Sequence, residues 1–484
     1  MDFSQFCGKR WTIIYGRYEG VEGNAVDELY KVMQQHVPYI LTVRAAESGL
    51  DGISDHNLAF IGTVSSNSYI RSFKNSGLIT PDGKKEGYTV KVCDNPLNPA
   101  RQAIIITGTD ENGVLYGVCD FEHYYVNRYW IKETYLSNTH ERMFTDRLPE
   151  FDRTASPAIE NRGIWTWGHV VYDYRRFFDN MSKWKMNMVI LWNDRAPLNA
   201  KKVVAYAHSR GIKVIWAYSW CWGEDVNPND EKELEYWKNR IISTYEREYA
   251  DTGADGIYFQ TFTEIKETEI GNSSVARLVS KWVNAMTGAL LEKYPDLWIQ
   301  FGIHATSIKE NYTDVVIDPR VSIVWEDAGS FPYAYDADIT GDIAETLDYT
   351  SKISELRGKE EDFGAIVKGC ITLDWKTFEH QKGTFILGES KKDFIKNRSD
   401  EKSVKWRYIQ TKWVRNLGCV TGMAKIISEK DIKRASITVL IEDGMWEEHM
   451  YAPGAFFAEA VWDPRETPEQ IIEKVSMTND VYYI

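Results

Sequence analysis

Short apolar runs alternate with longer amphipathic stretches from about residue 160 towards the end of the chain. In the longer stretches, such as 231–251 and 273–294, apolar residues recur at the spacing of a helix that buries one face. Apolar runs that alternate with such helices predict parallel strands joined by helical crossovers, and eight of them predict a (β/α)₈ barrel. The predicted strands are RGIWTW (162–167), MNMVILW (186–192), IKVIWAY (212–218), DGIYFQTF (255–262), LWIQFGI (297–303), VSIVWE (321–326), AIVKGCITL (365–373) and GCVTGMA (418–424).

The first 150 residues have a different pattern, in which β-rich runs are bounded by Gly, Asn and Asp. Strands are expected at 11–16, 58–63, 88–93 and 103–108, and helices at 25–36 and 114–126. This order predicts a small α/β domain over 1–150 and a barrel domain over 151–484. Residues 144–158 are polar and contain two prolines, so we expect a linker there.

Composition narrows the class of protein. With 43% hydrophobic and 26% charged residues, the chain has the balance of a globular protein that buries a large core. The net charge of −14 and the absence of a basic run argue against a nucleic acid partner. The 18 Trp and 28 Tyr residues favour a carbohydrate ligand modestly, because the apolar face of a sugar ring stacks on aromatic rings.

The cysteines and the N-terminus predict a compartment. Six Cys residues show no zinc spacing, so we expect reduced thiols and neither a metal nor a cofactor. The N-terminus has no signal-peptide pattern, and no run of about 18 apolar residues predicts a membrane helix. As it stands, the sequence predicts a cytoplasmic protein, although an exported protein without its leader would look the same.

Polar and aromatic residues gather where the predicted barrel strands end, which is where barrel enzymes hold their catalytic groups. Many of them are carboxylates, and the sequence has neither a Gly-x-Ser-x-Gly nucleophile motif nor a phosphate-binding glycine loop. Glycoside hydrolysis requires two carboxyl groups on either side of the scissile bond. Glu264, which follows the apolar run IYFQ, is the first candidate for the protonated one. The predicted substrate-binding residues are Arg162, Trp165, His169, Asp194, Trp222, His304, Asp327 and Trp375.

Several segments resemble families of glycoside hydrolases. GADGIYFQTFTE (253–264) resembles the fourth-strand segment of family 67 α-glucuronidases, and 456–475 is similar to that family's closing segment. ENRGIWTW (160–167), together with 174–194, resembles the opening of the barrel in family 20 β-hexosaminidases. Residues 106–125 are similar to the non-catalytic α/β domain that precedes both barrels. Family 115 α-glucuronidases and family 163 endo-acting hexosaminidases share this architecture.

The resemblance implies that Glu264 is the general acid and that Arg162 binds a sugar hydroxyl. Thr263 stands where family 20 has the Asp that steers the substrate's acetamido group, so the sequence favours a pair of carboxylates instead. VWEDAG (324–329) replaces the base-carrying segments of family 67, and the second carboxylate is therefore not implied by the resemblance. Strand-end position ranks Glu326 first for that role, followed by Asp327, Asp194 and Glu379.

The sequence therefore predicts a glycosidase that removes a terminal sugar, of the N-acetylhexosamine or uronic acid class, from an oligosaccharide or glycan. One alternative is a carbohydrate-binding barrel without catalysis, since a fold does not determine a reaction. Another is a lyase or a metal-dependent hydrolase that uses His304, Asp194 and Glu326, although no ligand spacing supports it. The sequence predicts neither retention nor inversion, which depend on the distance between the two carboxyl groups.

Overall fold

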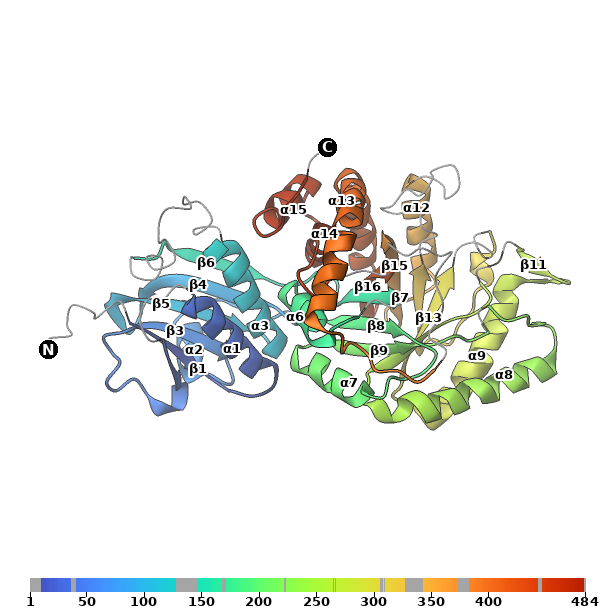
Figure 1. The fold of residues 1–484 in the computed structure, drawn as a ribbon, viewed down its shortest axis with the longest axis horizontal. Coiled ribbons are helices and arrows are strands. Elements are labelled where there is room, and N and C mark those ends of the chain that lie inside the picture. The colour runs from blue at the N-terminus through green and yellow to red at the C-terminus, as the bar shows by residue number, and fades with distance from the viewer. Residues whose placement is uncertain are drawn as a thin grey trace. The chain divides into compact units, whose positions relative to one another are not determined.

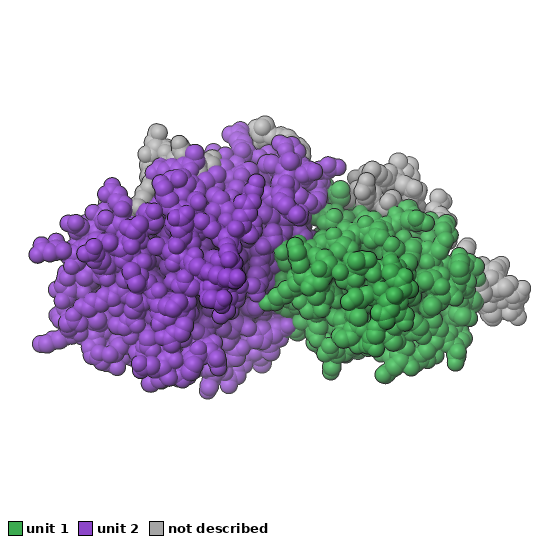
Figure 2. Space-filling view, turned by 180° about the vertical axis from the view of Figure 1, so that it is seen from behind, with its two compact units in different colours: residues 1–157, 209–211, 476–478 green, residues 158–208, 212–475, 479–484 purple. Residues whose placement is uncertain are grey.

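The computed structural model describes residues 10–35, 41–127, 147–167, 171–221, 223–263, 265, 267–304, 308, 310–326, 343–371, 383–442 and 446–482. The chain divides into two compact units, which Figure 2 colours separately. Unit 1 contains residues 1–157, 209–211 and 476–478, and unit 2 contains residues 158–208, 212–475 and 479–484. Among the helices in the described part of the chain, none combines the length and the apolar composition that a bilayer crossing requires.

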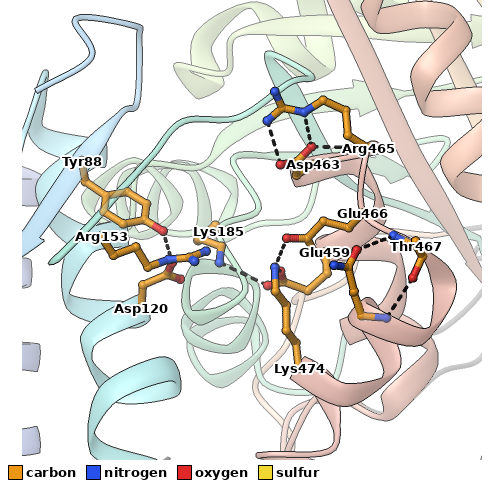
Figure 3. A network of polar contacts seen from close by, with 11 residues as sticks. Tyr88, Asp120, Arg153, Lys185, Glu459, Asp463, Arg465, Glu466, Thr467 and Lys474 are labelled. Carbon is orange, nitrogen blue, oxygen red and sulfur yellow. Dashed lines mark hydrogen bonds and ion pairs between the residues drawn. The ribbon is translucent and has the colours of Figure 1, made fainter. Parts of the chain in front are cut away.

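Unit 1 is a six-stranded mixed sheet with the order β2-β1-β3-β5-β4-β6. Strands β2, β1, β3 and β5 run parallel to one another, whereas β4 is antiparallel to both of its neighbours, β5 and β6. Asp120 at the end of α3 accepts hydrogen bonds from Tyr88 and Arg153 (Figure 3), which joins that helix to two strands. The elements are β1 (Trp11–Tyr15), α1 (Gly20–Gln34), β2 (Thr42–Ala45), β3 (Asn57–Thr63), α2 (Ser68–Asn75), β4 (Tyr88–Asn95), β5 (Asn98–Gly108), α3 (Glu111–Asp120) and β6 (Phe151–Ala155).

Unit 2 contains a closed barrel of eight parallel strands surrounded by helices (Figure 1), which confirms the predicted (β/α)₈ fold. Its strands are β7 (Asn161–Trp167), β8 (Met188–Trp192), β9 (Lys213–Ala217), β10 (Gly256–Gln260), β13 (Trp298–His304), β14 (Val321–Glu326), β15 (Asp362–Ile371) and β16 (Arg434–Glu442). The barrel closes where β16 pairs with β7. The helices are α6 (Tyr174–Lys183), α7 (Ala200–Ser209), α8 (Glu231–Thr244), α9 (Val275–Lys293), α12 (Ile343–Ser354), α13 (Lys392–Ser428), α14 (Ala452–Trp462) and α15 (Pro468–Val475).

The strands of the barrel are buried on both faces, and alternate residues serve different cores. In β8, Val189 and Leu191 belong to the large cluster that includes the surrounding helices, whereas Met188, Ile190 and Trp192 belong to the cluster that fills the barrel. This two-residue period follows from the pleat of a β-strand. It explains why the barrel strands have nearly continuous apolar sequences.

The predicted eighth strand is wrong. Residues 418–424 lie inside α13, a helix of 37 residues. Trp413, Leu417, Val420 and Ile427 are buried on one face of that helix at intervals of three to seven residues. The segment GCVTGMA is short and apolar, as a buried strand is, and was therefore predicted as one. The eighth strand of the barrel is β16.

The predicted linker is also wrong in part. Phe151–Ala155 form β6, which pairs with β4 along the edge of the sheet in unit 1. Pro149 precedes this strand and Pro157 follows it, so neither proline interrupts the ladder of hydrogen bonds.

A buried network of ion pairs joins the end of α6 to α14 and α15, the last two helices of unit 2 (Figure 3). The Lys185 ammonium group, which follows α6, lies 3.2 Å from the Glu459 carboxylate of α14, and both side chains are buried. Lys474 of α15 lies 3.8 Å from the same carboxylate and also pairs with Glu466. Lys185 further lies over the Trp462 ring, at 4.9 Å from its centre.

Candidate active site

Three tryptophans and a tyrosine form an aromatic wall inside the barrel. Trp165 and Trp167 from β7 stack with their ring centres 5.9 Å apart, and Trp192 at the end of β8 packs against both. Tyr258 from β10 contacts Trp165 and Trp192 edge to face. Trp167 and Trp192 are the last residues of their strands, so the wall reaches the carboxyl ends, where barrel enzymes form their sites.

Glu326 is the centre of a polar cluster next to this wall. It is the last residue of β14, and its side chain is completely buried. Its Oε1 atom accepts hydrogen bonds from the Tyr258 hydroxyl and the Gln260 amide, both on β10. Its Oε2 atom lies 3.4 Å from the Lys368 ammonium group on β15. These two donors and the neighbouring ammonium group compensate a buried charge, which would otherwise be costly.

Gly302 of β13 leaves the space that this cluster needs. A Cβ atom at this position would overlap the Tyr258 hydroxyl and the Glu326 carboxylate. The tyrosine can therefore cross the inward face of β13 only because the residue there has no side chain. Gly302 therefore contributes to the site by the absence of a side chain.

His304 lies at the end of β13 beside the cluster. Burial and the positive charge of Lys368 hold the pKa of His304 well below its ordinary value, so the ring is neutral near pH 7. Its main-chain N–H donates to the Thr263 hydroxyl at 3.3 Å. This bond fixes Thr263, which precedes Glu264 in sequence, just beyond the carboxyl end of β10.

A second buried carboxyl group, Glu447, lies in the segment after β16. Its Oε1 atom accepts from the main-chain N–H groups of Tyr172 and Asp173 at 2.6 and 3.3 Å. Burial raises the pKa of this carboxyl to about 7. Because Asp173 caps the N-terminus of α6, Glu447 links the segment after the eighth strand to the first barrel helix.

The structure brings four of the predicted site residues towards the carboxyl ends of the barrel. Glu326, His304 and Trp165 belong to the cluster and wall just described. Asp194, which follows β8, is exposed and lines a neighbouring pocket. Glu264, His169, Trp222, Asp327 and Trp375 lie outside the described residues, so their predicted roles stay predictions.

Arg162 is not part of this group. It lies at the start of β7, and its guanidinium group donates to the main-chain oxygens of Ile159, Glu160 and Lys185 at 2.7 to 3.2 Å. It also packs over the Trp462 ring, with 5.1 Å to the ring centre. These contacts lie at the amino end of the strand, opposite the carboxyl end at which the predicted sugar contact would lie.

Tyr258 and Lys368 were missed as site residues because they lie in the interior of strands, and Gln260 was missed because its strand was predicted to continue to residue 262, whereas β10 ends at Gln260. The alternation of side chains along a strand could have identified them. Lys368 is two residues beyond Ile366, and Gln260 is two residues beyond Tyr258, and both Ile366 and Tyr258 point into the barrel. A lysine at an inward position of an otherwise apolar strand requires a buried partner. Across the described residues, His, Cys, Asp and Glu side chains form no group of three or more that could hold a metal ion.

Comparisons with known proteins relate the chain to others through its fold. No protein-family model matches the sequence, and no curated protein matches it either. The crystal structure of beta-N-acetylhexosaminidase from Bacteroides fragilis NCTC 9343 is 13% identical, with a TM-score of 0.50 over 97% of this chain and 92% of that one. A structure described as that of CpGH84D is 14% identical, with a TM-score of 0.45 over 75% of this chain, and the match spans 57% of that chain. At such identity the fold alone is shared, and it resembles that of a glycoside hydrolase.

Proposed function

We propose that this chain is a glycoside hydrolase that removes a terminal sugar, of the N-acetylhexosamine or uronic acid class, from an oligosaccharide or glycan. The observation that carries the proposal is the arrangement at the carboxyl ends of the barrel. There, a buried carboxylate and a neutral histidine lie beside a wall of tryptophans. Aromatic faces accept the apolar face of a sugar ring, and the polar groups fix its orientation. The fold shared with a β-N-acetylhexosaminidase supports the proposal.

In the proposed reaction, Glu264 protonates the glycosidic oxygen as the bond to the leaving group breaks, and water adds to the anomeric carbon and gives up a proton, so that the products are the free sugar and the protonated leaving group. Glu326 is the second carboxylate and stabilises the positive charge that develops on the sugar ring. Lys368, Tyr258 and Gln260 hold it in place, so that it needs no reorganisation when that charge appears. The neutral His304 ring accepts or donates a hydrogen bond at a sugar hydroxyl.

A carbohydrate-binding barrel without catalysis is the second candidate. The complete burial of Glu326 favours it, because a carboxylate that already has two hydrogen-bond donors and an ammonium partner can serve as a structural group of the barrel. This alternative keeps the aromatic wall as a sugar-binding surface but assigns no reaction to the carboxylates. It predicts that sugars bind without being cleaved.

A panel of aryl glycosides that includes glucuronides and N-acetylglucosaminides of both anomers tests the proposal. We expect turnover of at least one substrate and a loss of about 10²–10⁴ in the Glu264→Gln variant, the usual contribution of a general acid. Glu267→Gln is the matched control, since Glu267 is exposed three residues further along. Chelation of metal ions should leave the rate unchanged. Sugar binding by calorimetry without turnover of any glycoside would instead establish the binding barrel.

A further inference from the structure

A pocket of about 580 Å³ adjoins the aromatic wall. Trp192, which packs against Trp165 and Trp167 inside the barrel, also lines this pocket. The other lining residues come from the segments that follow β8 and β9, and from α8 with the turn after it. The pocket therefore lies beside the proposed site, with Trp192 common to both.

One face of α8, continued by the π-helical segment Tyr245–Tyr249, supplies two of the pocket's three arginines. Trp237, Arg240, Thr244 and Arg247 all line it, at intervals of three or four residues. This spacing places their side chains along one side of a helix. The Arg240 guanidinium lies over the buried Trp237 ring at 4.4 Å from its centre, which holds the planar group against a rigid surface.

The charges in the pocket favour an anion. Arginines at three positions, Arg195, Arg240 and Arg247, face only two lining carboxylates, Asp194 and Glu224, in a chain whose net charge is −14. The contact between Arg240 and Glu224 is long, at 3.7 Å, and about half of each side chain is exposed. Such surface pairs contribute little and exchange easily for a better partner.

Arg195 is the most available of these cations. It is exposed, and among the described residues it has neither a hydrogen bond nor an ion pair. Arg247 pairs at 2.8 Å with Glu248, which is its neighbour in sequence and does not line the pocket. The pocket thus presents one unengaged guanidinium and two that are weakly engaged at its surface.

We propose that this pocket binds a carboxylate or sulfate group of an acidic glycan, carried on a sugar next to the one in the barrel. Guanidinium groups match the planar carboxylate and the sulfate oxygens with paired hydrogen bonds. Trp192 and Trp237 contribute apolar edges to the lining of the pocket. The identification of the ligand as a glycan rests on the proposed function. The arginines of the pocket add that this glycan carries an acidic group.

Calorimetry on the full-length Glu264→Gln variant tests the pocket without requiring turnover. The probes are an oligogalacturonate, a sulfated galactan oligosaccharide and an uncharged chito-oligosaccharide of equal length. We expect at least one acidic probe to bind about tenfold more tightly than the uncharged one, with an affinity that falls as salt is raised. The acidic probe that binds identifies the group as carboxylate or sulfate.

Arginine variants identify the binding surface. Arg195→Gln removes no contact to a described residue, so it should leave the fold intact and weaken acidic binding about fivefold, and the Arg195→Gln/Arg240→Gln pair should weaken it further. Arg415→Gln, an exposed position on α13, is the matched control and should change nothing. Equal affinity for the charged and uncharged probes, or an equal loss of affinity in the Arg415→Gln control, would overturn the proposal that this pocket binds the acidic group. If the acidic probe binds in a way that requires Arg195 but the protein cleaves no glycoside, the anion-binding role of the pocket would be supported and the proposed hydrolase activity would be rejected.

Discussion

Gly302 gives the tyrosine on β10 access to the carboxylate on β14. In Gly302→Ala the added methyl group overlaps both the Tyr258 hydroxyl and Glu326, so one of them must move. Overpacking of this kind costs about 1–3 kcal/mol, and we expect that loss in the free energy of unfolding measured in urea. Gly288→Ala is the control: Gly288 lies in α9 with no atom near the added Cβ, so that alanine should stabilise the protein by about 0.5–1 kcal/mol.

Glu447 should make the stability of the barrel depend on pH. Its pKa is 4.5 when unperturbed and about 7 when buried in the folded protein. Between these values the folded state holds a proton that the unfolded state has lost, so the contribution to stability is lost as pH rises from 4.5 through 7. At about 1.4 kcal/mol for each unit of pKa, the full effect is about 3 kcal/mol.

Glu447→Gln isolates this effect, because the amide oxygen still accepts from Tyr172 and Asp173 while nothing titrates. The difference in the free energy of unfolding, variant minus unmodified protein, should be about 2–3 kcal/mol more positive at pH 8 than at pH 5. Urea unfolding at the two pH values measures this difference. A constant difference at both would show that the buried carboxyl does not titrate in this range.

The candidate site could be predicted from sequence only where a single residue marks the end of a strand. Glu326 and His304 were found in that way. Lys368 and Tyr258 were not, because each contacts Glu326 from a different strand, 42 and 68 positions away in the chain. The pairing of β14 with β15 and with β13, which in turn pairs with β10, brings these side chains together, and no local pattern encodes those contacts.

At the scale of elements, the buried pair of Lys185 and Glu459 joins the end of α6 to α14. Lys185→Met removes the closer ammonium partner of this buried carboxylate, so we expect a loss of about 3 kcal/mol in stability. Replacing both residues with Met removes the uncompensated charge as well. The double variant should therefore be less destabilised than the sum of the two single variants in a thermodynamic cycle. Additive losses would mean that the two charges do not interact.

The eighth strand shows where element prediction failed. Within β16, Ile437, Val439 and Ile441 face the outer helices while Leu440 faces the barrel interior, a pattern typical of a buried strand. The segment GCVTGMA has a similar apolar content, but its apolar residues continue the helical spacing of α13. Length distinguishes the two: the spacing extends over 37 residues, which no barrel strand approaches.

At the scale of the whole molecule, the regular alternation of strands and helices was enough to predict the closed barrel. Seven of the eight strands were located because each is a short, nearly continuous apolar run. The boundary before the barrel was harder to place, because β6 has a polar sequence at the sheet edge of unit 1. Polar side chains are typical of edge strands, which makes them resemble loops in sequence.

The central claim is that Glu264 donates the proton to the leaving group. The most direct measurement compares the Glu264→Gln variant with the unmodified protein on two glycosides of the same sugar, one with phenol and one with dinitrophenol as leaving group. Phenol needs the proton, so the variant should lose about 10²–10⁴ in kcat/KM on that substrate. Dinitrophenol leaves without protonation, and the loss on that substrate should be far smaller. Losses of equal size on both substrates, or a loss below about tenfold on the phenyl glycoside, would contradict the assignment.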